Sequence, residues 1–331
     1  HGKSEIRWLM VVLLILGVHA ALVWGGVTPV LHGDMPDSDT FMRLVRVEAW
    51  VNGQSWFDSA VARMNAPYGD VLNWTRPLDM LIVAGAWPLH RWQGMDWHTA
   101  LFWSGAALPI VLHMLLGLTI VWAFAPLMPR GMGPLLFVVA LLQPVMLAYN
   151  MAGRPDHQTL LLICAALMFG GLVREQAGTH RPLRCAIDAG LWAGVGLWVS
   201  TEYQFVVIVV TGVLALLWLK TGEDRHLRAL EGLALGLFAM TGLAVLAERG
   251  ADWARVRELD KVSLSQLLAS AVNCGVWGFV VGFGRDRGFL RRLGVLVGFG
   301  LSGLLGLLFF APEILRGPAG DVDPRVLRDF L

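Results

Sequence analysis

Charged residues are scarce in this sequence. Only 15% of its 331 residues are Asp, Glu, Lys or Arg, and 56% are hydrophobic, whereas charged residues make up about 25% of a typical water-soluble protein. This composition excludes a water-soluble enzyme, a disordered chain and a small disulfide-stabilised scaffold.

The sequence also lacks an excess of positive charge and has few cysteines. Its 26 Lys and Arg nearly balance 25 Asp and Glu, for a net charge of +1, so no basic field attracts nucleic acid. The odd set Cys164, Cys185 and Cys274 lies within apolar runs and indicates buried thiols. Motifs for soluble nucleotide cofactors are missing as well.

Long apolar runs are abundant instead. A helix needs about 20 apolar residues to cross the roughly 30 Å hydrocarbon core of a membrane. The runs predict an all-α polytopic membrane protein with about nine transmembrane helices, in which residues 1–315 form one domain. The predicted spans are 7–27, 99–124, 133–149, 158–173, 185–200, 203–219, 227–246, 263–284 and 293–315.

Basic residues gather in alternate connections between these spans. Every connection on the side of the N-terminus carries at least one Arg or Lys, whereas acidic residues gather in the opposite loop 28–98. Positive loops stay in the cytoplasm. We therefore predict a multi-pass protein of the cell (inner) membrane with a cytoplasmic N-terminus and a functional face in the periplasm or outside the cell.

The first exterior loop, residues 28–98, is too long to be structureless. A cap at Ser38 or Asp39 predicts an amphipathic helix that ends at Asn52. The apolar run 78–89 is too short to span a membrane and predicts a second surface or re-entrant helix.

Basic and aromatic residues of this loop are candidates for substrate binding. Arg43 and Arg46 share one stripe of the first loop helix and are expected to face lipid headgroups or a phosphate. Arg76 could bind a phosphate through two nitrogens, and Tyr68 or Trp74 could stack on a sugar. Ordinary loop packing is the alternative, and it is stronger for the aromatic residues than for Arg76.

Three carboxylates stand close together at the start of the loop, on Asp34, Asp37 and Asp39. They repel one another unless a cation, a proton or a hydrogen-bond donor lies between them. A metal ion or a substrate with an acidic proton would meet this need. The alternative is a solvated turn followed by a helix cap.

A second polar cluster, Arg154, Asp156 and His157, lies in the short exterior turn after the third span. Placing such charged residues at a membrane boundary is unfavourable in free energy unless they are paired or face a polar cavity. Arg154 and Asp156 could neutralise each other; otherwise this cluster faces the same cavity as the first. Glu202, in the turn between the fifth and sixth spans, either pairs with an exterior arginine or caps a helix.

The order of these motifs along the chain resembles that in the GT-C superfamily of membrane glycosyltransferases, in particular in the catalytic subunit of oligosaccharyltransferase. That family has an Asp followed six residues later by Arg after the first helix, as Asp37 and Arg43 are here. It also has Ala-Gly-x-x-Asp-x-Glu after the third helix, which residues 152–158 match except at Gln158. The likeness covers roughly residues 7–210.

The resemblance implies transfer of a sugar from a polyprenyl-phosphate or polyprenyl-diphosphate donor, held among membrane lipids, to an exterior glycan, lipid or protein. A divalent metal, Mg or Mn, would be bound by Asp39 and Asp156, although Gln158 replaces an acidic ligand. The exterior tail 316–331 would lead to a further C-terminal part. The expected catalytic residues are Asp37, Asp39 and Asp156, and the expected substrate-binding residues are Arg43, Tyr68, Trp74, Arg76, Arg154, His157 and Glu202.

Two other classes of protein fit the same spans. A transporter or flippase of lipid-linked sugars would use intramembrane carboxylates and often shows inverted repeats. The sequence has no clear repeat, and its acids gather toward one face. A non-catalytic subunit of a membrane complex would need only the spans. The sequence leaves open the sugar, the acceptor and the number of sugar units transferred.

Overall fold

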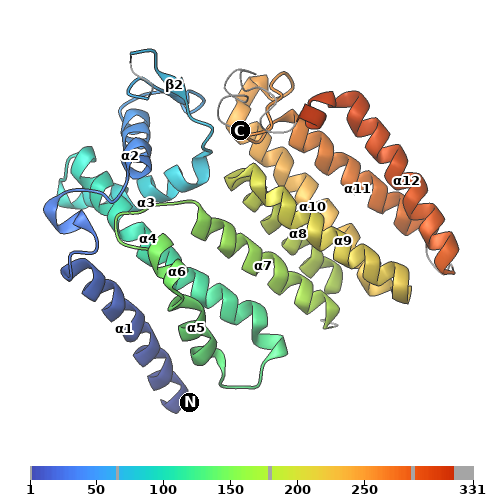
Figure 1. Cartoon of the computed structure of the whole chain (residues 1–331), viewed down its shortest axis with the longest axis horizontal. Coiled ribbons are helices and arrows are strands. Elements are labelled where there is room, and N and C mark those ends of the chain that lie inside the picture. The colour runs from blue at the N-terminus through green and yellow to red at the C-terminus, as the bar shows by residue number, and fades with distance from the viewer. Residues whose placement is uncertain (1, 65–66, 178–180, 285–287, 317–331) are drawn as a thin grey trace, which may run out of the picture. The chain divides into compact units, whose positions relative to one another are not determined.

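The chain folds almost entirely into helices, which divide into two compact units, His1–Gly170 and Gly171–Leu331 (Figure 1). The predicted all-α polytopic class is confirmed. The predicted tail 316–331 lies outside the described residues from position 317 onward. The computed structural model describes residues 2–64, 67–177, 181–284 and 288–316.

The first unit holds the N-terminal helix, the long loop 28–98 and the helices that pack against it. Its elements are α1 (Gly2–Trp24), η1 (Pro29–His32), α2 (Ser38–Val51), β1 (Ala60–Val61), β2 (Asp70–Val71), α3 (Arg76–Gln93), α4 (Trp97–Phe124), η2 (Ala125–Leu127), α5 (Gly133–Leu141), α6 (Pro144–Tyr149) and the start of α7 (Gln158–Gln176).

The second unit continues from α7 as a bundle of helices. α10 packs against α8, α9 and α11, and α11 packs against α12. The elements are α8 (Pro182–Val199), η3 (Thr201–Tyr203), α9 (Gln204–Thr221), α10 (Asp224–Arg249), η4 (Gly250–Asp252), α11 (Leu264–Gly284), α12 (Phe289–Phe310) and η5 (Pro312–Arg316).

Seven helices in the described ranges are long and apolar enough to cross a membrane, two fewer than the nine predicted. The predicted span 133–149 is divided into α5 and α6, because Pro144 cannot continue the helix before it and starts a new one. The predicted span 185–200 corresponds to α8, whose Arg184 and Asp188 lower its mean hydropathy. The seven are 7–24, 97–127, 158–176, 201–221, 224–252, 264–284 and 289–310.

Both predicted loop helices form. α2 ends with Asn52 as its C-cap, as expected, but its N-cap is Asp37 and not Ser38 or Asp39. The Asp37 carboxylate accepts hydrogen bonds from the backbone N of Thr40 at 2.9 Å and from its Oγ1 at 2.7 Å. These bonds satisfy a donor of the first turn that has no partner within the helix. The second loop helix is α3, which contains the predicted segment 78–89.

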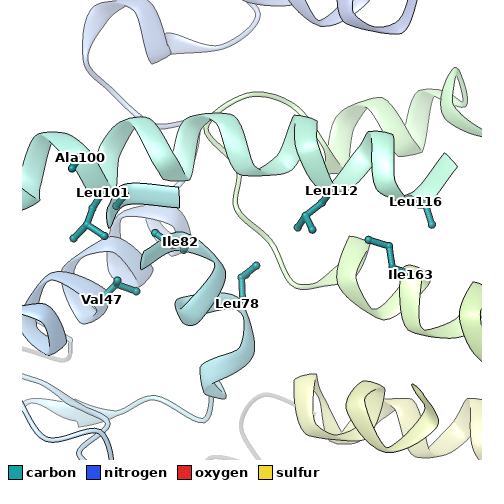
Figure 2. Packing of buried hydrophobic residues seen from close by; sticks show 9 residues of the cluster. Val47, Leu78, Ile82, Ala100, Leu101, Leu112, Leu116 and Ile163 are labelled. Atoms are coloured by element: carbon teal, nitrogen blue, oxygen red, sulfur yellow. The ribbon is translucent and has the colours of Figure 1, made fainter. Parts of the chain in front are cut away.

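Buried apolar side chains of α2, α3, α4 and α7 form the core of the first unit (Figure 2). α4 supports the other helices: Ser104 Oγ donates to the backbone O of Ile82 in α3 at 2.6 Å. The core residues are Val47, Leu78, Ile82, Ala86, Ala100, Leu101, Leu112, Leu116 and Ile163.

α4 also supports the turn that precedes α7. The backbone N of Gly153 donates to the backbone O of Ala106 at 3.1 Å. A Cβ at Gly105 would lie 3.0 Å from Leu44 Cδ2 and 3.7 Å from Pro155 Cγ. Because Gly105 has no side chain, both α2 and the turn can approach α4 closely at this position.

Candidate functional site

A pocket of about 250 Å³ lies in the first unit, where the beginning of α2 faces the turn before α7. The two acidic motifs of the sequence meet here, since each contributes carboxylates to the lining. The lining residues are Asp37, Asp39, Thr40, Arg43, Trp74, Tyr149, Arg154, Pro155, Asp156, His157 and Gln158.

An ion pair joins the two motifs. Arg154 Nε lies 3.2 Å from Asp37 Oδ2, and about a third of each side chain is exposed. The guanidinium carbon of Arg154 also lies 4.9 Å from the centre of the Tyr149 ring. Arg154 therefore pairs across the pocket with Asp37, and the alternative in which it neutralises Asp156 is wrong.

Asp156 is bound to its neighbour His157. His157 Nδ1 lies 2.9 Å from Asp156 Oδ1, and the backbone N of His157 donates to the same oxygen at 2.6 Å. Burial by itself would raise the pKa of Asp156. Three effects of His157 lower it: the side-chain contact, the charge of the ring and the backbone hydrogen bond. Together with the charge of Arg43 they outweigh burial, so the pKa of Asp156 is lowered. Asp156 therefore carries its negative charge into the pocket at neutral pH.

Arg43 is the buried cation of the pocket. Only 4% of the residue is exposed, and its guanidinium carbon lies 4.2 Å from the centre of the Trp74 ring. Burial lowers the pKa of Arg43 by more than the charges of Asp79, Asp156 and Asp39 raise it. Arg43 thus lies within electrostatic reach of carboxylates from both acidic motifs.

Asp79 fixes Arg43 from the protein side, although the sequence pattern did not single it out. The carboxylate is fully buried and lies 3.1 Å from Arg43 Nη1, 3.3 Å from Arg46 Nη1 and 3.3 Å from Arg76 Nη1. The signal in the sequence was an acid within an apolar helix, three residues after Arg76. A lone buried carboxylate requires a cationic partner.

Two predictions about arginines are wrong. Arg46 does not turn toward headgroups, because it is 2% exposed and contacts Asp79. Arg76 is not available to hold a phosphate, because it is 1% exposed and its Nη2 donates to the backbone O of Trp56 at 2.6 Å and of Asp58 at 2.8 Å. Arg76 instead fastens the loop that follows α2 to the start of α3.

The remaining predicted residues lie in three places. Trp74 lines the pocket and covers Arg43. Tyr68 lies between the antiparallel strands β1 and β2, where 87% of it is exposed, and it is not among the lining residues. Glu202 belongs to the second unit, where it is exposed in η3. Asp34 is exposed and its carboxylate bonds its neighbour's backbone N at 2.8 Å, as a solvated turn would.

The chemistry of the pocket does not fit the predicted Mg or Mn ion on Asp39 and Asp156. Asp156 Oδ1 accepts the backbone N–H of His157 and contacts its Nδ1, Asp37 is paired with Arg154, and Gln158 supplies a neutral amide. Hard divalent cations take several oxygen donors, usually including carboxylates. No group of three His, Cys, Asp or Glu suited to a metal occurs among the residues whose placement is described.

Solved structures with a similar fold are archaeal oligosaccharyltransferases, although no protein-family model and no curated protein matches the sequence. AglB from Archaeoglobus fulgidus, in complex with an inhibitory peptide and a dolichol-phosphate, matches 99% of this chain with a TM-score of 0.66 and 16% identity. The same organism's enzyme in complex with Zn and sulfate matches 93% with a TM-score of 0.63 and 16% identity. Its form tethered to an acceptor peptide matches 82% with a TM-score of 0.60 and 16% identity.

These comparisons establish the fold. The chain has a GT-C-like fold that resembles oligosaccharyltransferase, as the motifs predicted. It spans 40% of the length of the chain with the dolichol-phosphate, 41% of the chain with Zn and sulfate, and 34% of the chain with the tethered peptide.

Proposed function

We propose that this chain is a GT-C-type membrane glycosyltransferase that uses a polyprenyl-phosphate-linked or polyprenyl-diphosphate-linked sugar donor. The observation that carries the proposal is that Asp39 and Asp156, from motifs far apart in sequence, line one pocket together with Arg43 and Arg154. The fold adds support, because one solved structure that shares it is in complex with a dolichol-phosphate.

In the proposed reaction, a nucleophilic atom of the acceptor attacks the anomeric carbon of the sugar. The bond between that carbon and the phosphate oxygen breaks, and its electron pair leaves with the polyprenyl phosphate. Asp39 is exposed in the pocket, so its carboxylate can take the acceptor's proton as general base. Asp156, held in the charged form by His157, orients the acceptor or the sugar.

The two cationic residues face the leaving group. Charge that develops on the departing phosphate is stabilised most by fixed donors in a cavity with little water. Arg43 is fixed by Asp79, and Arg154 is positioned by Asp37. Trp74 and Tyr149 offer aromatic faces to the sugar. Glu202 remains a proposed substrate-binding residue of the second unit.

A membrane location suits such a donor, because its isoprenoid tail stays among membrane lipids while its phosphate and sugar enter the pocket. The segregation of Arg and Lys supports a cytoplasmic N-terminus and a pocket on the periplasmic or exterior face of the inner membrane. The acceptor is an exterior glycan, lipid or protein, and a solved structure with the same fold carries a tethered acceptor peptide.

The test is a turnover assay on the purified chain in lipid nanodiscs with a panel of polyprenyl-phosphate and polyprenyl-diphosphate sugars carrying a radiolabel. We expect release of the polyprenyl phosphate, and a loss of roughly a hundredfold or more in D39N and D156N. D96N, at an exposed helix cap outside the pocket, is the control. If lipid-linked sugars cross vesicle membranes but no donor is cleaved, the chain is a flippase and the proposal fails.

A further inference from the structure

We propose that Arg43 is the resident cation of the pocket and binds the phosphate of the donor in the place where a divalent metal would otherwise be needed. The inference rests on the proposed function and assigns the phosphate site within it. It differs from the predicted metal site, in which Asp39 and Asp156 act as ligands.

The first argument is the position of the guanidinium. Arg43 lines the pocket, Asp79 Oδ1 accepts from its Nη1 at 3.1 Å, and Trp74 covers one face at 4.2 Å. A guanidinium has five N–H donors in a planar fork that matches phosphate oxygens. Among the described residues Asp79 accepts one of these donors, so others remain for an anion in the pocket.

The second argument is the charge of the neighbouring carboxylates. The charges of Asp156 and Asp39 both favour the protonated, positively charged form of Arg43. Carboxylates on facing sides of one pocket repel each other unless a positive charge lies near both, and the guanidinium of Arg43 supplies that charge. A divalent cation placed on the same carboxylates would also be repelled by the guanidinium of Arg43.

The third argument is the way Arg43 is held. Asp79 is fully buried and is shared with Arg46 and Arg76. One carboxylate is therefore shared by three guanidiniums. Asp79 acts as a positioning residue that fixes Arg43 from the protein side.

The chain offers a matched pair of variants. Arg43 and Arg46 are both buried and both contact Asp79, but only Arg43 lines the pocket. R43K and R46K keep the positive charge and remove the planar fork. If Arg43 binds the phosphate, only R43K weakens anion binding.

The first experiment measures binding of inorganic diphosphate to the purified chain in nanodiscs by calorimetry, first in EDTA and then without EDTA and with Mn²⁺ added. We expect saturable binding to the wild type, binding weakened roughly tenfold or more in R43K, and affinity within about twofold of wild type in R46K. Equal losses in both variants, or binding to the wild type only after Mn²⁺ is added, would overturn the inference. Because this assay needs no turnover, it gives a result even if the transferase proposal fails.

The second experiment measures Mn²⁺ binding by electron paramagnetic resonance, without donor. We expect no saturable site in the wild type or in Q158E, and saturable Mn²⁺ binding in R43Q/Q158E, where the repelling guanidinium is absent. Saturable Mn²⁺ binding by the wild type overturns the inference. If R43Q/Q158E does not fold, as judged by thermal unfolding, the wild-type and Q158E measurements still decide it.

Discussion

Asp37 in the first acidic motif and Arg154 in the second form an ion pair across the pocket, with a distance of 3.2 Å between Arg154 Nε and Asp37 Oδ2. The same Asp37 carboxylate caps α2. One side chain therefore sets both where the helix begins and where Arg154 points. The two effects can be separated by substitution, because a cap needs an acceptor oxygen and the ion pair needs a charge.

Replacing Asp37 should separate capping from pairing. D37A removes the cap and should lower the free energy of unfolding by about 1 kcal/mol, whereas D37S keeps a capping oxygen and should lose only a few tenths. Both variants release Arg154, so we expect both to lose most of their turnover. Chemical denaturation and the turnover assay are the two measurements. If D37S is as active as the wild type, the ion pair has no role in the reaction.

Gly153 should tolerate alanine less well than another glycine with a similar backbone. Gly153 has φ +84° and Gly26 has φ +72°, and a Cβ at Gly153 would lie 2.5 Å from Val30 Cγ2 whereas at Gly26 it would meet nothing within 4 Å. The backbone strain costs roughly 1 to 3 kcal/mol in both variants. G153A should lose roughly another 1 to 3 kcal/mol from overpacking. Equal melting temperatures for G153A and G26A would contradict this packing.

Removing the buried carboxylate of Asp79 should destabilise the first unit strongly. D79N leaves three buried guanidiniums without their common counter-ion, and loss of one partner from a buried ion pair costs about 3 to 5 kcal/mol. The measurement is equilibrium unfolding in detergent, with D96N at an exposed cap as control. A loss below about 1 kcal/mol in D79N would show that water reaches this cluster.

Trp74 should influence binding of the donor more than the protein's stability. It covers Arg43 at 4.2 Å, and a cation above an aromatic ring is worth roughly 0.5 to 2 kcal/mol. We expect W74A to raise the KM for the donor and W74F to retain most of the affinity. Steady-state kinetics over donor concentration gives both constants. Unchanged KM in W74A would remove Trp74 from the binding site.

His157 should control the acid limb of the pH profile. The pKa of Asp156 is lowered from 3.8 because contacts from His157 and the charge of Arg43 outweigh burial. The charged carboxylate is therefore kept until the pH falls below 3.8, and its contribution to stability is lost only as the pH falls through the lowered pKa. H157A removes the side-chain contact and the charge of His157, so the pKa of Asp156 should be higher than in the wild type and the acid limb of turnover should move to higher pH. H98A, altered at an exposed histidine, should leave the limb in place.

Composition and the order of the motifs determined the class of this protein and much of its local structure. Apolar runs of spanning length fix an all-helical membrane protein, because a chain in lipid must satisfy its backbone hydrogen bonds within each segment. Local chemistry also placed α2 and α3, since a capping carboxylate and an apolar stripe act over a few residues. Asp37 and Asp156 could be singled out because charge near a membrane span is costly without a partner.

Only the tertiary structure decided which charges meet. Arg43, Arg46 and Arg76 look alike in sequence as possible phosphate ligands, yet burial around Asp79 leaves only Arg43 lining the pocket. Asp156 is the acid next to Arg154 along the chain, yet Arg154, in a turn supported by α4, pairs with the distant Asp37. Such choices depend on distances of a few ångströms between separate helices, which a sequence pattern does not contain.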